Sequence, residues 1–409
     1  MINPSRRTLN YKYAIRNLAR SAAILERAGR EIIYLNIGDP QKYGFRPPEH
    51  LVEAVTRALR NGFTGYSESA GLREAREAVA AYATTTAATP TNVEEVLITA
   101  GASEAGDLVL TALLNNCDEV LLPSPGYPLY PAIVNRSGGE VRYYTLDSSN
   151  KWQPSVEEVK RLITKRTRAL VLINPNNPTG SITSDSVTRQ LLELAVENQL
   201  LVISDEVYRE LCFGPQPTPA SVFARELGLP LVTLESLSKT HLVPGWRVGW
   251  MRFTNSEQMT DLITAINRLA DGRLCSPTPA QYAVRPALEG DRSFQIQFMS
   301  ELRRRRDLAV DYVTASGQLS CAIPEAAFYL MVKVDDTVEE GEGATDESFL
   351  LSLLEETGVL VVHGSGFGLP SSPIFFRLVF LANDQVLTRA LDRISQFLAL
   401  RSAAQLLRE

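Results

Sequence analysis

The segment from Ser236 to Arg247 carries side chains that suit covalent chemistry on a phosphorylated ligand. It places Lys239 among small hydroxyl residues and sets Arg247 eight positions further on. A lysine in an apolar pocket loses its proton and attacks a carbonyl carbon, whereas an arginine stays charged and binds phosphate oxygens with two N–H groups. Together they predict a site for an aldehyde that carries a phosphate, which is pyridoxal phosphate. Taken alone, Ser-x-Ser-Lys is more typical of a lysine in a polar surface loop.

The end of another apolar run offers a carboxylate to the same cofactor. The segment Ser204 to Tyr208 places Asp205 at the tip of a predicted strand and Tyr208 one helical turn further on, on the same side. A carboxylate against the pyridine nitrogen would keep that nitrogen protonated, because a charge pair at about 4 Å in an effective dielectric of about 20 is worth up to ~4 kcal/mol. The alternative is that Asp205 caps a helix from Glu206 to Leu211.

Two further strand ends carry groups that suit ligand binding. Asn174 to Gly180 holds repeated X-Pro pairs that stiffen an extended turn, from which Asn177 can aim its amide at a ligand; a plain strand-exit turn is the alternative. Ala100 to Glu104 lies between a strand and the apolar helix 108–114, so its backbone N–H groups predict an anion site at a helix start. Any strand-to-helix turn shares part of that pattern.

An aromatic turn and a glycine-rich turn complete the set of candidates. Tyr127, in the turn Pro125 to Tyr130, could lie flat over a cofactor ring, where stacking is worth about 1 kcal/mol, or could pack within its own loop. The glycine cluster at 364–368 is followed by Leu369 to Pro373 and not by a helix. A dinucleotide site is therefore not predicted there.

Apolar, β-branched runs alternate with helical patterns along most of the chain. Continuous apolar strands separated by helices predict an α/β fold with a mostly parallel seven-stranded sheet that helices cover on both faces. The candidate sites then fall at the carboxyl ends of strands, where such sheets bind ligands. The predicted strands are 96–99, 119–122, 141–144, 169–173, 201–204, 231–234 and 248–251.

The C-terminal part follows a different pattern. From about Phe294 a charged helix leads to an apolar strand at 327–332, a further helix and a strand at 374–380, which predicts a smaller α+β domain. We expect residues 46–293 to form the large cofactor-binding domain and residues 294–409 the small domain. Residues 1–45 are expected to join the small domain.

Composition indicates a protein that acts on small molecules. With 409 residues, 44% of them hydrophobic, the chain is long enough for a large core. Its net charge of -6, with acidic and basic residues interspersed, predicts no binding to nucleic acid or membranes. Three histidines and four scattered cysteines predict neither a metal site nor a disulfide framework. Charged residues interrupt 11–30, which predicts an amphipathic helix in a cytoplasmic protein and not an export signal.

The candidate motifs occur in the order and with the separations found in a known family. Asn177 precedes Asp205 by 28 residues, and Lys239 follows Asp205 by 34. From about Tyr11 to about Leu398 the chain resembles class I aminotransferases, enzymes of the pyridoxal-phosphate fold type I group. The resemblance implies that fold, the cofactor pyridoxal 5'-phosphate, and a homodimer with composite active sites.

The resemblance also implies a role for each candidate residue. Lys239 would bind the cofactor and move a proton between substrate and cofactor, Asp205 would pair with the pyridine nitrogen, and Tyr127 would stack on the ring. Tyr208 and Asn177 would bind the phenolic oxygen. The implied phosphate ligands are Gly101, Ala102, Ser103, Ser236, Ser238 and Arg247, with Tyr66 of the partner subunit. The implied ligands of the substrate α-carboxylate are Arg377, Asn177 and the backbone of Gly38.

Within the family, the chain is most similar to alanine aminotransferases. The segments that carry this likeness are Leu35–Pro40, Phe45–His50, Arg273–Cys275 and Val362–Gly368. Those relatives usually carry Asn-Gly where this chain has Glu235-Ser236, and Gly where it has Ala326. The resemblance implies ping-pong transfer of an amino group between alanine or glutamate and a 2-oxo acid, pyruvate or 2-oxoglutarate.

Other activities use the same residues. An aminotransferase for aspartate, aromatic or branched-chain amino acids would need the same lysine and arginine. A pyridoxal-phosphate-dependent C–S lyase or an aminocyclopropane-carboxylate synthase would need the same lysine. A non-catalytic effector-binding domain of a transcription regulator also occurs on this fold. It would need an N-terminal DNA-binding domain, and only about ten residues precede the matching region.

Overall fold

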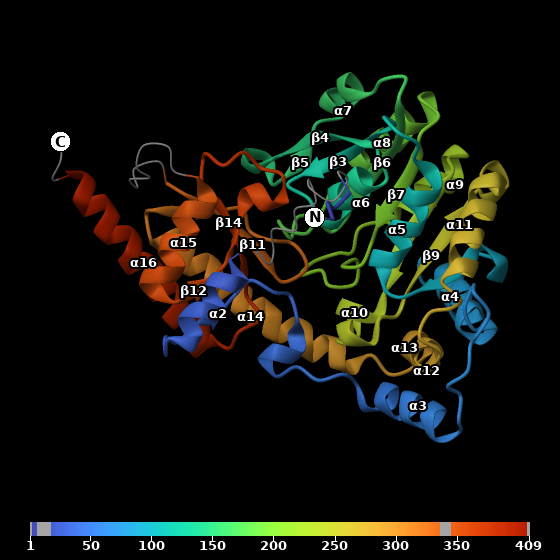
Figure 1. The fold of residues 1–409 in the computed structure, drawn as a ribbon, viewed down its shortest axis with the longest axis horizontal. Coiled ribbons are helices and arrows are strands. Elements are labelled where there is room, and N and C mark those ends of the chain that lie inside the picture. The colour runs from blue at the N-terminus through green and yellow to red at the C-terminus, as the bar shows by residue number, and fades with distance from the viewer. Residues whose placement is uncertain (1, 6–17, 336–344, 407–409) are drawn as a thin grey trace.

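The computed structural model describes residues 2–5, 18–335 and 345–406, which form a large domain beside a smaller one (Figure 1). The large domain is built on an eight-stranded sheet with the strand order β2-β9-β8-β7-β6-β3-β4-β5. Strands β3, β4, β6, β7 and β8 pair in parallel, and β9 is antiparallel to both of its neighbours. The strands are β2 (Val96–Thr99), β3 (Glu119–Ser124), β4 (Glu140–Asp147), β5 (Gln153–Pro154), β6 (Thr167–Ile173), β7 (Leu201–Asp205), β8 (Leu231–Ser236) and β9 (Gly249–Thr254).

All seven predicted strands are present, and the mostly parallel sheet is confirmed. The eighth strand, β5, pairs antiparallel with β4 at the sheet edge and has only two residues, too few to show a periodic pattern. Alternate residues of a strand point to opposite faces. In β6, residues 169, 171 and 173 belong to one core cluster and residues 170 and 172 to another. The sheet is therefore buried on both faces, which explains its continuous apolar runs.

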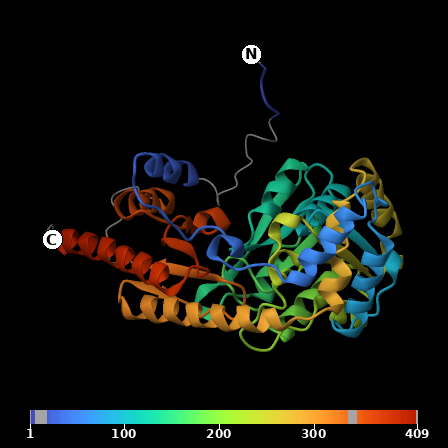
Figure 2. The same ribbon diagram turned by 90° about the horizontal axis from the view of Figure 1, so that it is seen from below.

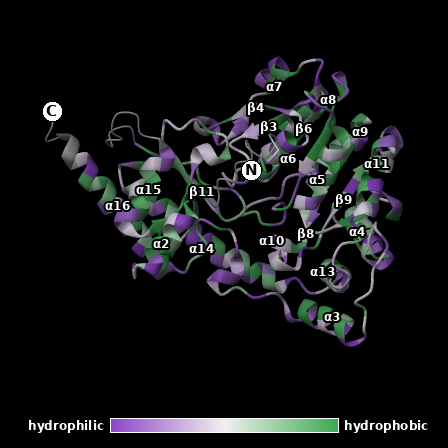
Figure 3. Cartoon of the chain, in the orientation of Figure 1, coloured by the Kyte–Doolittle hydropathy of each residue, from purple (hydrophilic) through white to green (hydrophobic). Residues whose placement is uncertain are grey.

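Helices cover each face of this sheet. One layer holds α5 (Ala102–Leu113), α6 (Leu129–Arg136) and α11 (Thr260–Gly272), and the opposite layer holds α7 (Val156–Leu162), α8 (Asp185–Glu197) and α9 (Ala220–Leu227). A third group packs beside β2 and β9: α3 (Glu49–Arg60), α4 (Arg73–Thr85), α12 (Thr278–Gln281) and α13 (Val284–Glu289). Hydrophilic and hydrophobic residues alternate along these peripheral helices (Figure 3), as expected for helices with one face on a core.

The small domain is an antiparallel sheet packed against helices. Its strand order is β10-β11-β14-β13, with β10 (Leu319–Cys321), β11 (Tyr329–Val334), β13 (Val362–His363) and β14 (Phe375–Val379). The helices are α2 (Ala19–Arg27), α14 (Ser293–Ala315), α15 (Asp346–Thr357) and α16 (Asp384–Leu406). The two long helices α14 and α16, orange and red, lie side by side along one edge of the domain (Figure 2).

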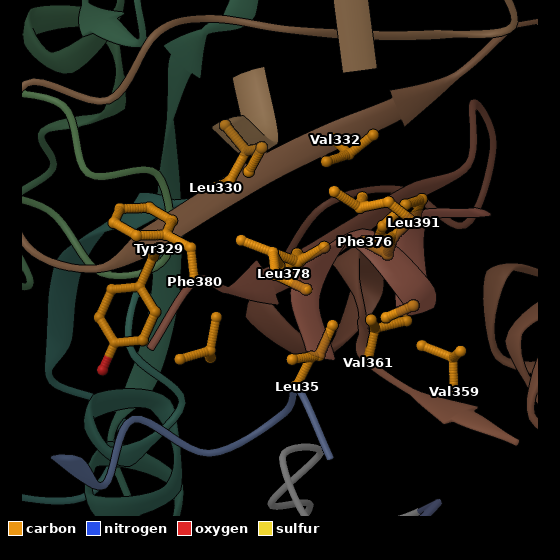
Figure 4. Packing of buried hydrophobic residues seen from close by; sticks show 14 of the residues in the cluster. Leu35, Tyr329, Leu330, Val332, Val359, Val361, Phe376, Leu378, Phe380 and Leu391 are labelled. Carbon is orange, nitrogen blue, oxygen red and sulfur yellow. The ribbon is translucent and has the colours of Figure 1, made fainter. Parts of the chain in front are cut away.

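The N-terminal segment packs on the small domain. Strand β1 (Ile33–Tyr34) pairs in parallel with β12 (Val359–Leu360). Leu35 belongs to one buried cluster with Val361 and with residues of β11 and β14, among them Leu378 (Figure 4). This pairing supports the prediction that the N-terminal segment joins the small domain. The domain limits at residues 45 and 293 stay predictions.

The predicted helix at 11–30 is only partly covered by the structure. Helix α2 begins at Ala19 and ends at Arg27, and residues 6–17 lie outside the described part of the chain. Among the described residues, no helix is both long enough and apolar enough to cross a bilayer.

Candidate active site

A cavity of about 200 Å³ lies where the carboxyl ends of the parallel strands face the small domain. Two of the predicted residues do not line it: Gly101 lies behind Arg247, and Tyr66 is 84% exposed on the single chain. The structure brings all the others together at this cavity, namely Gly38, Ala102, Ser103, Tyr127, Asn177, Asp205, Tyr208, Ser236, Ser238, Lys239, Arg247 and Arg377.

Lys239 projects into the cavity from α10 (Leu237–Thr240), the short helix that follows β8. The helix start is held by the Ser236 side chain, which accepts a hydrogen bond from the Ser238 N–H at 3.3 Å. The Lys239 Nζ donates to the carbonyl oxygen of Gly38 at 2.7 Å. Burial is the main cause that lowers the pKa of Lys239 to about 8. Near neutral pH the amine therefore loses its proton readily, as a nucleophile or base must.

Arg247 and the start of α5 form an anion-binding corner. Arg247 donates to the carbonyl oxygens of Ala100 at 2.9 Å and Pro244 at 3.1 Å. A Cβ atom on Gly101 would collide with the guanidinium, and Gly101 has a φ of +81°, so only glycine suits this position. The N–H groups at the start of the 12-residue helix α5 and the arginine thus lie together, which suits a phosphate.

Asp205 lies at the end of β7, with a partner that the sequence interpretation missed. Tyr130, in α6, donates a hydrogen bond of 2.6 Å to Oδ2 of Asp205, and the Val207 N–H donates to Oδ1 at 3.3 Å. Desolvation raises the pKa of Asp205, and the bond from Tyr130 works in the opposite direction. A cation that binds here would favour the ionised carboxylate.

The predicted helix from Glu206 to Leu211 is wrong, so Asp205 is not a helix N-cap. Residues 207–210 form a turn. The N–H of Glu206 binds the Leu234 carbonyl oxygen at 2.9 Å and so extends the sheet ladder. Leu211 accepts from the Ala327 N–H of the small domain at 2.8 Å. Two local bonds of turn type remain, from the Arg209 N–H to Glu206 and from the Leu211 N–H to Tyr208, but the segment also pairs with distant segments and forms no helix.

Arg377 lies at the other end of the cavity, in the centre of β14. Its Nη1 donates to Asn177 Oδ1 at 2.9 Å and its Nη2 to the Asn36 carbonyl oxygen at 2.6 Å. The guanidinium carbon lies 4.5 Å from the ring centroid of Tyr329 and 4.8 Å from that of Phe367. Neutral acceptors and aromatic rings thus hold a buried cation at the cavity wall. Such a group suits bidentate binding of a carboxylate.

Four neighbours of the predicted residues were not found from the sequence: Tyr130, Tyr329, Phe367 and Asn36. Tyr130 and Phe367 lie in motifs noted for other reasons, Tyr329 lies in the predicted strand 327–332, and Asn36 lies in a segment that served to compare subgroups. No local signal separates them from packed residues, because their role depends on contacts across the fold.

Comparison with known proteins places the chain in a family. Residues 30–394 match the family Aminotransferase class I and II. The chain is 35% identical to the glutamate-pyruvate aminotransferase AlaA of Haemophilus influenzae, over 95% of this chain and 96% of that one. It is 36% identical to the alanine aminotransferase of Mycobacterium tuberculosis, over 94% of this chain and 90% of that one. An aspartate aminotransferase of Geobacillus stearothermophilus is 30% identical over 94% and 96%.

Solved structures agree with this assignment. An alanine aminotransferase from Pyrococcus furiosus superposes with a TM-score of 0.93, at 36% identity over 98% of this chain and 100% of that one. An aspartate aminotransferase from Thermotoga maritima superposes with a TM-score of 0.85 at 32% identity, over 97% of this chain and 100% of that one. The chain belongs to the class I and II aminotransferases, which are pyridoxal-phosphate-dependent enzymes. The residues present fit that cofactor: the corner beside Gly101 suits its phosphate, Asp205 its pyridine nitrogen and Lys239 its aldehyde.

Proposed function

We propose that this aminotransferase moves the amino group between alanine and 2-oxoglutarate, with pyruvate and glutamate as the products, in two half-reactions. The observation that carries the choice of alanine is the lining of the cavity. Among the described residues, its charged side chains are Asp205, Lys239, Arg247 and Arg377, and each has a proposed ligand in the cofactor or the α-carboxylate. The rest of the cavity wall is uncharged and includes Ile37, Gly38, Tyr127 and Tyr329. A methyl side chain suits such a wall.

The choice of glutamate as the second amino acid rests on the relatives. The protein of Haemophilus influenzae is a glutamate-pyruvate aminotransferase. An aspartate aminotransferase is also similar, at 30% identity, so aspartate is the main rival substrate.

The cofactor's binding residues have separate tasks in this proposal. When bound, pyridoxal phosphate supplies an electron-accepting ring, which Asp205 keeps protonated at its nitrogen. Arg247, Ser236, Ser238 and the start of α5, at Ala102 and Ser103, would hold the phosphate, and Tyr127 would stack on the ring. Tyr208 donates to the phenolic oxygen. Because Asn177 Oδ1 accepts from Arg377, its Nδ2 is the group that donates to the phenolic oxygen and the substrate.

Lys239 and Arg377 act on the substrate. Arg377 binds the α-carboxylate through two N–H groups, with the backbone of Gly38 beside it, and so orients the Cα–H bond toward Lys239. With the cofactor bound, the neutral Lys239 amine would be the group that takes the proton from Cα and later returns it. The low pKa of Lys239, about 8, is what makes the amine available as this base.

We also propose a homodimer with composite sites. Tyr66 is 84% exposed, and further apolar surface lies at Leu59, Phe63 and Leu274. Phe63 stacks on Tyr282 at 5.1 Å and presents a flat aromatic surface. Covering these side chains with a second copy would bury exposed apolar surface and bring Tyr66 to the phosphate site of the partner. A cytoplasmic location remains part of the proposal.

A two-substrate activity panel tests the proposed reaction. Alanine alone is expected to release one pyruvate per site, and alanine with 2-oxoglutarate to give parallel double-reciprocal lines. The proposed substrate is wrong, although the family assignment stands, if aspartate, aromatic or branched-chain amino acids react and alanine does not. Release of pyruvate and sulfide from cysteine without any oxo acid would instead indicate a C–S lyase.

A further inference from the structure

Tyr329 is a buried side chain that contacts both ends of the active site. It begins β11, is 3% exposed and lines the cavity. Its hydroxyl lies 2.7 Å from the hydroxyl of Tyr208. Its ring centroid lies 4.5 Å from the guanidinium carbon of Arg377. One residue thus touches the proposed ligand of the phenolic oxygen and the proposed ligand of the α-carboxylate.

The surroundings hold the Tyr329 ring in one place. A Cβ atom on Gly38 would lie 2.5 Å from the Tyr329 Oη and 3.1 Å from its Cε1, so the ring lies directly over the Gly38 backbone. The rings of Phe328 and Tyr208 lie on other sides, with centroids at 4.8 and 5.6 Å. The Tyr329 hydroxyl points away from the aliphatic side chains of the core (Figure 4). Close packing of this kind restricts the orientation of the ring.

We propose that Tyr329 is a positioning residue that couples the cofactor end of the site to its carboxylate end. Its hydroxyl donates to Oη of Tyr208, and its ring holds the plane of the Arg377 guanidinium. The inference rests on the proposed function, because it assumes the roles given above to Tyr208 and Arg377.

The direction of the hydroxyl pair follows from what Tyr208 has to do. A tyrosine hydroxyl has one proton to donate. If Tyr208 donates that proton to the phenolic oxygen of the cofactor, it accepts the bond in the pair and Tyr329 donates it. A donor that itself accepts a hydrogen bond is polarised and donates more strongly. Tyr329 therefore strengthens the bond that Tyr208 makes to the cofactor.

The ring acts on Arg377 through its contact with the guanidinium. Phe367 makes a second such contact, at 4.8 Å, so two aromatic rings lie against the cation. Its N–H groups then point along the plane toward Asn177, the Asn36 backbone and the cavity. Loss of one ring would let the guanidinium tilt, and the planar match to a carboxylate would weaken.

The hydroxyl is tested with Tyr329→Phe, which keeps the ring. The readout is the pH midpoint of the bound cofactor's absorption in the absence of substrate, which reports the proton shared by the lysine nitrogen and the phenolic oxygen. A weaker bond from Tyr208 leaves more negative charge on that oxygen and raises the proton affinity. We expect the midpoint to rise by about 0.5 pH unit, since polarisation adds a fraction of the strength of a charge-assisted bond. An unchanged midpoint overturns the proposed role of the Tyr329 hydroxyl.

The ring is tested with Tyr329→Leu. The readout is the affinity of the loaded enzyme for propionate, a carboxylate of substrate size that lacks an amino group. We expect Tyr329→Leu to weaken propionate binding about tenfold, the order of a desolvated cation–π contact, and Tyr329→Phe to leave it unchanged. Equal propionate affinities for wild type and Tyr329→Leu overturn the proposed role of the Tyr329 ring, provided that circular dichroism shows both proteins folded. If Tyr329→Leu does not fold, Tyr329→Met takes its place.

Two control variants separate this inference from the proposed function. Tyr208→Phe should raise the pH midpoint more than Tyr329→Phe, and Arg377→Lys should weaken propionate binding. If the controls respond and the Tyr329 variants do not, the coupling is wrong and the proposed roles stand. If the controls themselves do not respond, the roles of Tyr208 and Arg377 are wrong and the inference falls with them.

Discussion

The Tyr130 hydroxyl donates a 2.6 Å hydrogen bond to Oδ2 of Asp205, and both buried side chains line the active-site cavity. Tyr130→Phe removes this bond without changing the shape of the ring. We expect a 10- to 100-fold loss of affinity for pyridoxal phosphate, because a hydrogen bond to a charged group is worth about 1.5–3 kcal/mol. Equilibrium dialysis of the cofactor measures the effect.

Tyr144→Phe is a matched control for this prediction. Tyr144 is equally buried, and its hydroxyl donates to the Val171 carbonyl oxygen at 2.8 Å, away from the cavity lining. Its loss should lower the stability of the fold and leave cofactor affinity unchanged. Equal cofactor losses in both variants would mean that Tyr130 acts only through stability.

Lys239 should make the stability of the cofactor-free protein depend on pH. Burial lowers its pKa from 10.5 to about 8 in the folded state, so between these values the unfolded chain holds the proton and the folded chain does not. Stability therefore rises with pH through this window. Lys239→Met removes the cost of burying an amine that loses its proton and should be more stable at about pH 7, by on the order of 2 kcal/mol. The gain should shrink as the pH approaches 10.5.

Urea unfolding of the cofactor-free proteins at several pH values checks the Lys239 prediction. Lys160→Met, which removes an exposed lysine of α7, is the control for loss of a positive charge. A stability difference between Lys239→Met and wild type that does not change with pH would contradict the assigned cause.

Arg377→Lys should damage the reaction and spare the cofactor. Lysine keeps the charge and loses the planar fork, so kcat/KM for the amino acid should fall by about two orders of magnitude, or about 3 kcal/mol. The absorption spectrum of the bound cofactor should stay the same. Arg189→Lys, on the exposed face of α8, should change neither quantity. A parallel loss of cofactor would instead make Arg377 a structural residue.

Glu235 should be essential for stability. It is buried in β8, where it pairs with Arg252 at 2.7 Å and with Arg209 at 3.8 Å and accepts from the Trp250 indole at 3.0 Å. Glu235→Ala leaves two buried arginines short of a counter-charge and should cost about 3–5 kcal/mol. Glu193→Ala, from an exposed pair on α8, should cost less than about 1 kcal/mol. Similar losses in chemical denaturation would refute the buried-charge argument.

Tyr66 tests the composite site. If it reaches the phosphate of the neighbouring subunit, a hybrid of Tyr66→Phe and Lys239→Ala chains contains one site with both native residues. Refolding the two inactive or weakened variants together should then give more activity than the average of the two alone. Activity equal to that average, or a fully active monomer in sedimentation, would contradict the proposal.

The parts of this protein that local sequence decides were predicted well. The apolar strand runs are continuous because both sheet faces are buried. Each run can therefore be recognised from its own residues, without knowledge of its neighbours. Asp205 stands at the end of a strand, and Asn177 and Lys239 stand a few residues beyond strand ends. The ends of parallel strands meet at one edge, so their convergence follows from the strand pattern.

Only the tertiary structure decided the contacts between residues that are far apart in the chain. The bonds of Tyr130 with Asp205, Tyr208 with Tyr329, and Arg377 with Asn177 span 75, 121 and 200 residues. The turn after Asp205 differs from the predicted helix for the same reason, since its backbone pairs with the small domain and with β8. Local propensity carries no information on such partners, and hydrogen bonds gained across the fold outweigh the small preference of a short segment for helix.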